Sequence, residues 1–144
     1  MMDTQKIAEA YAKFYESLSA DSPREEYGVY FDGASEFADP FQKVQGLGAI
    51  HNVFVAMYKN LRNPRFVVDE IVCSDEVAYL RWRFFYALSS KADEQSFTGV
   101  SRVTFTQSAK VKSHIDYWDA AENVYEKIPL LGSLIRFVKR KIHA

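Results

Sequence analysis

The chain has 144 residues; 48% are hydrophobic, 15% are aromatic, and the formal net charge at pH 7 is −1. This length suits one domain with a hydrophobic core, and the composition excludes an intrinsically disordered chain. The single cysteine, Cys73, excludes an intramolecular disulfide, and no apolar run reaches signal-peptide or membrane-spanning length. We therefore expect a cytoplasmic protein.

The charge is unevenly distributed along the chain. Residues 127–144 contain five Lys and Arg residues and no Asp or Glu, which leaves a net charge of −6 for residues 1–126. A nucleic-acid-binding protein usually carries its positive charge on its main body. We therefore expect no nucleic-acid partner.

Apolar residues at helical spacing predict three helices in the first part of the chain, over residues 4–18, 23–30 and 47–61. In the segment "SPREE", Ser22 is expected to cap the second helix, and Glu25 completes a capping box.

Between the second and third helices, "EFADPFQKVQG" predicts an extended, half-buried stretch that ends at Gly46. Asp39 precedes a proline in this segment, and a following proline disfavours the helical conformation.

After Pro64 the hydrophobic period changes from 3.6 to 2, which predicts strands. We expect four of them, over residues 66–73, 77–88, 96–106 and 111–119. Short polar turns separate them, as antiparallel hairpins require. In the second strand every even position is apolar or aromatic, whereas Arg81 and Arg83 occupy odd positions. One face of this sheet is therefore expected to be buried and the other at least partly solvated.

The last segment, residues 123–144, predicts a basic amphipathic helix that Gly132 interrupts or bends. We expect a main domain over residues 1–122 and this extension packed on the same domain. The extension has three interpretations: it covers an open end of the fold, it packs across a dimer, or residues 127–144 contact an anionic membrane surface.

No motif in the chain predicts a metal or a cofactor. The histidines His51, His114 and His143 are isolated and lack zinc-site spacing, and no GxSxG, GxGxxG or phosphate-binding loop is present.

The segment "HIDYWD" contains the most informative polar residues. As a strand, it places His114, Asp116 and Trp118 on one face, and Ile115 and Tyr117 on the other. A histidine and a carboxylate two residues apart on a strand have Cβ atoms about 6–7 Å apart, close enough to interact. Alternation alone does not decide which face is buried, because both faces carry residues suited to a core.

Two segments resemble a known family: "FADPFQKVQGLGAI" and the final hairpin "VTFTQSAKVKSHIDYWD". They are similar to the SnoaL-like and ketosteroid isomerase-like branch of the nuclear transport factor 2-like (NTF2-like) superfamily, over most of residues 4–120. The resemblance implies an α+β cone-shaped fold, with three N-terminal helices against a curved antiparallel sheet. It also implies a homodimer formed through the sheet. The basic helix at the C-terminus lies outside the common pattern.

The resemblance also implies roles for single residues. Asp39, followed by Pro40, matches the general base of ketosteroid isomerases, and Tyr15 matches their oxyanion-donating tyrosine. Their second donor, a protonated aspartic acid, corresponds here to Ser101, so the match breaks at that position. In this family the face of the last strand that carries His114 and Asp116 is turned toward the cone interior.

Three residues are therefore our catalytic candidates: Asp39, His114 and Asp116. The candidates for binding a ligand are Tyr15, Tyr58, Trp82, Phe84, Ser101 and Trp118. The first hypothesis is acid–base chemistry without a cofactor on a hydrophobic, carbonyl-containing small molecule. The alternatives are a non-catalytic module that binds a lipid or metabolite, and a homodimeric interaction domain with a membrane-surface tail.

Overall fold

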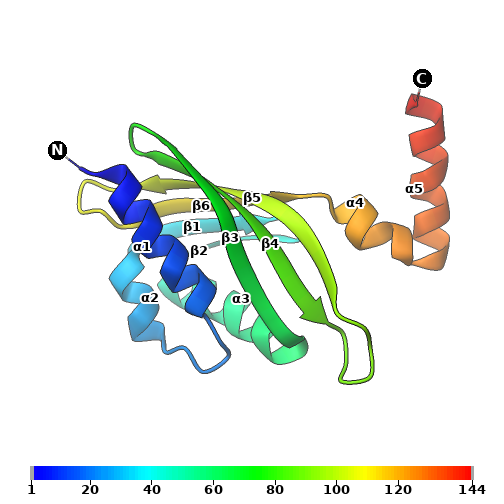
Figure 1. Ribbon diagram of the computed structural model, residues 1–144, viewed down its shortest axis with the longest axis horizontal. Helices are drawn as coiled ribbons and strands as arrows, with labels where there is room; N and C mark the ends of the chain where they lie inside the picture. Colours follow the sequence, from blue (N-terminus) through cyan, green and yellow to red (C-terminus); the bar gives the residue numbers. More distant parts are fainter. Residues whose placement is uncertain (1, 144) are drawn as a thin grey trace.

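The computed structural model describes residues 2–143, the side chain of Glu126 excepted, so Met1 and Ala144, the outer ends of the two expected regions, lie outside the described residues. The helices are α1 (Thr4–Ser17), α2 (Arg24–Tyr30), α3 (Leu47–Asn60), α4 (Ala120–Asn123), the 3₁₀ helix η1 (Tyr125–Lys127) and α5 (Pro129–Ile142). The strands are β1 (Phe31–Asp39), β2 (Gln42–Gln45), β3 (Arg62–Ser74), β4 (Val77–Ala87), β5 (Gln95–Phe105) and β6 (Val111–Trp118). Figure 1 shows the first three helices on one side of a curved sheet, with α5 standing apart at the other end.

The six strands form one sheet in the order β2-β1-β6-β5-β4-β3. All neighbours pair antiparallel except β1 and β6, which are parallel and place Phe37 opposite His114. The α+β cone is thus the expected fold. The sheet differs from the expected antiparallel one only in the parallel pairing of β1 with β6. Parallel neighbours need a long crossover between them, and here all the elements from β2 to β5 separate the two strands in the chain.

The extended stretch before the third helix folds as the hairpin of β1 and β2. Asp39 closes its turn, because its Oδ1 accepts hydrogen bonds from the backbone amides of Phe41 (2.8 Å) and Gln42 (3.0 Å). Gly46 then begins α3 with a φ of 95°, a conformation that suits glycine and few other residues. This hairpin brings Asp39 to one end of the sheet.

The second helix begins without its expected side-chain cap. It starts at Arg24, and the Ser22 hydroxyl accepts a hydrogen bond from the Ser19 amide (3.0 Å) in the turn that follows α1. The predicted capping box of Ser22 and Glu25 was therefore wrong, because the N-cap position is occupied by Pro23, whose side chain has no hydrogen-bond acceptor.

Strand β4 confirms the alternation predicted from the sequence. Its buried residues are Ala78, Leu80, Trp82, Phe84 and Tyr86. The intervening Arg81 and Arg83 are exposed and lie near Asp69 on the solvated face. The concave face of the sheet is therefore an aromatic wall that the three N-terminal helices cover.

Gly99 on β5 makes room for the largest side chain of that wall. It lies opposite Trp82 in the β4–β5 register, and a Cβ at this position would overlap the indole ring. We expect Gly99→Ala to lower the free energy of unfolding by about 1–3 kcal/mol, because the ring must move. Urea unfolding measures this, with Gly33→Ala as the control, since nothing lies within 4 Å of a Cβ added there. An equal effect of the two substitutions would contradict the packing described.

The C-terminal segment has two parts that differ in their contacts and meet at η1. Val124 and Lys127 line the large cavity described below, so the beginning of the extension lies against the domain. α5 packs on η1 and stands away from the sheet (Figure 1). The expected boundary at residue 122 falls within α4, and close packing of the whole extension on the domain stays a prediction. Among residues 2–143 no helix has the length and apolarity needed to cross a bilayer.

Candidate functional site

A cavity of about 510 Å³ lies between the concave sheet face and the helices. Its walls are mostly aromatic and aliphatic, as is usual for sites that bind small molecules. Six of the nine predicted site residues line it: Tyr15, Asp39, Trp82, Phe84, Asp116 and Trp118. Ser101 and His114 lie behind this lining, and Tyr58 is buried away from it.

His114 and Asp116 form a buried pair on β6. His114 is fully buried, Asp116 is 8% exposed, and the His114 Nε2 lies 2.6 Å from Asp116 Oδ1. Tyr117, on the opposite face of the strand, is 58% exposed. The face that carries His114 and Asp116 is therefore the one turned into the protein, as the resemblance implied.

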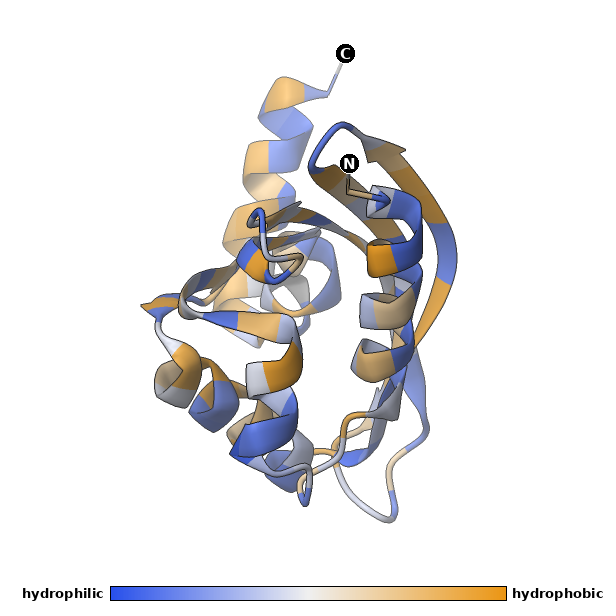
Figure 2. Cartoon of the chain, turned by 90° about the vertical axis from the view of Figure 1, so that its left-hand side faces the viewer, coloured by the Kyte–Doolittle hydropathy of each residue, from blue (hydrophilic) through white to orange (hydrophobic). Residues whose placement is uncertain are grey.

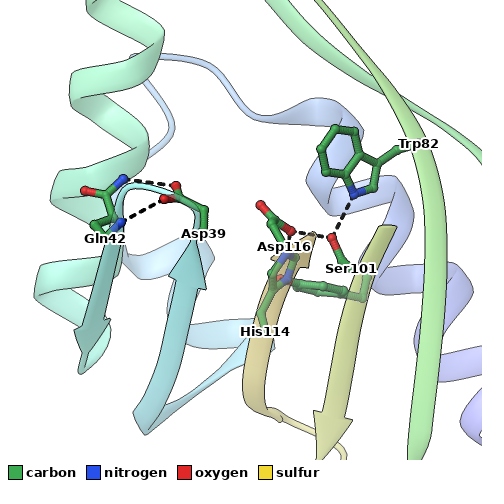
Figure 3. Close-up of polar contacts among 7 residues, drawn as sticks. Asp39, Gln42, Trp82, Ser101, His114 and Asp116 are labelled. Atoms are coloured by element: carbon green, nitrogen blue, oxygen red, sulfur yellow. Dashed lines mark hydrogen bonds and ion pairs between the residues drawn. The ribbon is translucent and has the colours of Figure 1, made fainter. Parts of the chain in front are cut away.

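The pair belongs to a longer chain of hydrogen bonds (Figure 3). The Trp82 indole N–H donates to Ser101 Oγ (2.8 Å), and the Ser101 hydroxyl donates to Asp116 Oδ1 (2.5 Å). Ser101 and Asp116 are opposite each other in the β5–β6 register, which fixes their approach. Position 101 thus supports the carboxylate of Asp116 and does not itself reach the cavity.

At its other end the chain reaches α1. The Tyr11 hydroxyl lies 2.7 Å from His114 Nδ1, and it has no other hydrogen-bond partner among the described residues. A neutral His114 with its proton on Nε2 satisfies every group, because Tyr11 donates to Nδ1 and Nε2–H donates to Asp116. A protonated ring would leave the buried Tyr11 proton without an acceptor. The geometry therefore favours neutral histidine beside an ionised Asp116.

This arrangement leaves one carboxylate oxygen of Asp116 available. Both protein donors bond to Oδ1, and Oδ2 has no hydrogen-bond partner within residues 2–143. Figure 3 shows Oδ2 directed away from Ser101. Since Asp116 lines the cavity, Oδ2 is placed to accept a proton or a hydrogen bond from a bound molecule.

Tyr15 lines the same cavity. Its hydroxyl is buried and has no hydrogen-bond partner among the described residues, and its ring stacks on His114 at a centroid distance of 5.1 Å. Burial and the nearby charge of Asp116 raise the pKa of the Tyr15 hydroxyl well above its usual range. Tyr15 therefore stays a neutral phenol, able to donate a hydrogen bond to a ligand oxygen.

Asp39 lines the cavity too, but its carboxylate is engaged in the turn. Oδ1 accepts the two backbone amides already described, and Oδ2 accepts from the Gln42 side chain (3.0 Å), as Figure 3 shows. Three donors on one carboxylate favour a structural role, as is common for aspartate at a turn. Of the two candidate carboxylates, Asp116 is the better placed for chemistry.

Sequence reasoning missed Tyr11 and the exposed rim of the cavity. Tyr11 shares the apolar stripe of α1 with Tyr15 one turn later, and that i, i+4 spacing was the available signal. Six residues of the lining are exposed, and we call three of them, Phe41, Leu88 and Lys127, the cavity mouth. Within the described part of the chain, no three His, Cys, Asp or Glu side chains gather as metal ligands.

Tyr15→Phe is expected to lower ligand affinity without lowering the stability of the fold. The substitution removes a buried, unpartnered hydroxyl, so we expect the free energy of unfolding to stay equal or rise by up to about 1 kcal/mol. Ligand affinity should fall about tenfold, because one hydrogen bond to the ligand is lost. Tyr58→Phe is the matched control: its hydroxyl is also buried and unpartnered but lies outside the cavity. Equal affinity losses in both variants would contradict the assignment of Tyr15.

Comparison with known proteins agrees with the observed fold. The model of the SnoaL-like domain matches residues 8–114. No curated protein matches the chain.

Solved structures with the same fold include three bacterial proteins. An Agrobacterium tumefaciens protein, provisionally named an isomerase of the SnoaL-like family, is 18% identical and has a TM-score of 0.66, covering 83% of this chain and 99% of its own. A Jannaschia protein, provisionally named a SnoaL-like polyketide cyclase, is 12% identical, with a TM-score of 0.71 and coverages of 82% and 88%. A Catenulispora acidiphila protein with a ketosteroid isomerase-like fold, solved with trimethylamine, is 11% identical, with a TM-score of 0.68 and coverages of 81% and 87%. At these identities the likeness establishes the fold.

Proposed function

Because the chain belongs to the SnoaL-like family, we propose that its cavity is an active site for cofactor-independent proton transfer on an apolar, carbonyl-containing small molecule. The observation that carries this proposal is the carboxylate of Asp116, which two donors hold by Oδ1 while Oδ2 is open to an apolar cavity. A fixed base inside a water-poor site is what abstraction of a weakly acidic proton requires.

Asp116 is the base in this mechanism. Its Oδ2 takes a proton from the carbon next to the ligand carbonyl, and the electron pair of the broken C–H bond forms an enolate. Tyr15 donates a hydrogen bond to the developing enolate oxygen. Asp116 then returns the proton to another atom. Alternatively, the enolate carbon attacks a second carbonyl carbon and closes a ring, and the alkoxide formed from that carbonyl takes the proton from Asp116. No external oxidant or reductant is needed.

His114 acts through Asp116 and does not touch the ligand, since it is fully buried behind the carboxylate. Its Nε2–H keeps Oδ1 in place and stabilises the charge that Asp116 carries before the reaction. Ser101, itself oriented by Trp82, does the same from the other side. We therefore assign His114 and Ser101 as positioning residues.

The cavity walls indicate the class of ligand. Trp82, Phe84 and Trp118 present aromatic surfaces, and few polar groups interrupt the lining. Such walls suit flat cyclic compounds that carry one or two polar oxygens. The provisional names of two neighbours, isomerase and polyketide cyclase, support this reading, because enolisation can begin both an isomerisation and a ring closure.

A thermal-shift screen tests the proposal with cyclic ketones, polyketide-like quinones, epoxides and fatty acids. A ligand at a hundredfold excess over its dissociation constant stabilises the protein by about 2.7 kcal/mol, which is readily detected. We expect ketones or quinones to stabilise the wild type, and Asp116→Asn to change their affinity more than Asp39→Asn does. Stabilisation by fatty acids alone, equal in all three proteins, would instead identify a non-catalytic lipid-binding module.

A homodimer formed through the sheet is a second proposal. It is supported by exposed apolar side chains on the outer face, at Val72, Tyr79 and Tyr117, of which Val72 and Tyr79 are neighbours in the β3–β4 register. Sedimentation velocity of the wild type and of Tyr79→Glu tests it: a dimer that Tyr79→Glu dissociates supports the sheet interface. A cytoplasmic location and the absence of a nucleic-acid partner stay predictions.

A further inference from the structure

α5 exposes a wide apolar face in the monomer. Its large apolar side chains are among the most exposed in the molecule, with Leu130 at 88%, Leu134 at 58% and Ile142 at 77% exposure. At 3.6 residues per turn, the apolar residues of α5 fall within about 160° of the helix circumference. Figure 2 shows hydrophobic residues along one side of this helix and hydrophilic residues along the other. An exposed face of this size requires an apolar partner.

The opposite side of α5 is strongly basic. Arg136, Lys139 and Arg140 lie there. Lys141 lies within the arc of the apolar face, with its ammonium 5.5 Å from the centre of the Phe137 ring. Residues 127–144 contain no acidic side chain, while residues 1–126 carry a net charge of −6. The partner of α5 must therefore offer an apolar layer and negative charge together.

We propose that α5 binds the surface of an anionic lipid bilayer. The apolar face enters the boundary between headgroups and acyl chains, and the cations contact the lipid phosphates. With 14 residues the helix is about 21 Å long, too short to cross the hydrocarbon core, so it lies in the plane of the surface. The proposal does not depend on catalysis in the cavity.

A membrane fits this helix better than a second copy of it does. Two α5 helices packed face to face would bring together two basic segments without one acidic side chain between them. An anionic bilayer satisfies both faces at once. Because Lys127 of the preceding η1 helix belongs to the cavity mouth, docking of α5 also brings that mouth toward the membrane, where apolar ligands concentrate.

Vesicle co-sedimentation of the full chain tests this inference. The vesicles are phosphatidylcholine alone, or phosphatidylcholine mixed with phosphatidylglycerol, at low and at high salt. We expect binding to the anionic vesicles only, and weaker binding as salt rises. Arg140→Glu should weaken binding about thirtyfold. The substitution changes the charge of the helix by two units, and each unit of charge near the anionic surface changes the affinity about fivefold. Leu134→Asp should abolish it.

Two exposed positions on the main domain serve as matched controls. Lys112→Glu makes the same charge change on β6, and Val29→Asp makes the same kind of apolar-to-acidic change on α2; neither should alter binding. No binding to anionic vesicles at low salt would overturn the proposal. So would a dimer in solution that Leu134→Asp dissociates while vesicles stay unbound, since the apolar face would then belong to a second copy.

Discussion

Asp116→Asn is expected to lower the turnover number by about 10²–10⁴ for any ligand that proves to be a substrate, the usual contribution of a general base. Asparagine has the shape of aspartate, and its amide oxygen still accepts the hydrogen bonds from Ser101 and His114. The fold and the cavity should therefore survive, with a free energy of unfolding within about 1 kcal/mol of the wild type. Initial rates and urea unfolding of the two proteins measure both quantities.

Asp39→Asn is the matched comparison, because it makes the same chemical change at the other carboxylate of the cavity. It should lower the free energy of unfolding by about 0.5–1 kcal/mol, because the hydrogen bond from the Gln42 side chain is lost. The turnover number should stay within a few fold of the wild type. A larger loss of turnover in Asp39→Asn than in Asp116→Asn would move the base to Asp39.

His114→Leu should have the largest effect on stability. It removes the acceptor of the buried Tyr11 hydroxyl and one donor to the buried Asp116 in a single step. Leaving two buried polar groups without partners costs about 2–4 kcal/mol, and leucine fills the space without replacing either bond. Urea unfolding at neutral pH measures the loss.

His51→Leu is the control for this prediction. His51 is partly buried and has one hydrogen bond, between its Nε2 and the Ser22 carbonyl (3.0 Å). Its replacement should lower the free energy of unfolding by about 1 kcal/mol. A His114→Leu protein as stable as the His51→Leu protein would show that the network adds nothing to the fold.

Most elements were predictable from the sequence, because local hydrophobic periodicity decides them. The stripe of α1 and the alternation of β4 each identify an element and its buried face. The start of β3 was predicted incorrectly, at residue 66, and the cause is local. That strand begins at Arg62 and includes Pro64, which is tolerated because β3 is at the edge of the sheet.

The rest of the architecture depends on contacts between distant parts of the chain. The parallel pairing of β1 with β6 has no signal in either strand. Likewise, the bond between Tyr11 and His114 joins residues 103 positions apart. Tyr11 and Tyr15 occupy equivalent positions in the helical pattern of α1. Only the fold determines that Tyr11 contacts His114 and that Tyr15 lines the cavity.

The two carboxylates illustrate the same limit. The motif around Asp39 matched a known base, yet its three donors belong to the turn in which it lies. Asp116 shares a strand face with His114, which the alternation of residues predicted. That only one of its oxygens is occupied could not be predicted, because it depends on Ser101 from the neighbouring strand.

Deuterium exchange measures proton abstraction from a bound ligand. The ligand that stabilises the protein best is incubated with catalytic amounts of enzyme in D₂O, and its mass is followed over time. The assignment of Asp116 as the base predicts deuterium at the carbon beside the ligand carbonyl with the wild type, and a rate about 10²–10⁴-fold slower with Asp116→Asn. A bound carbonyl ligand whose protons exchange no faster with the wild type than with Asp116→Asn would contradict it.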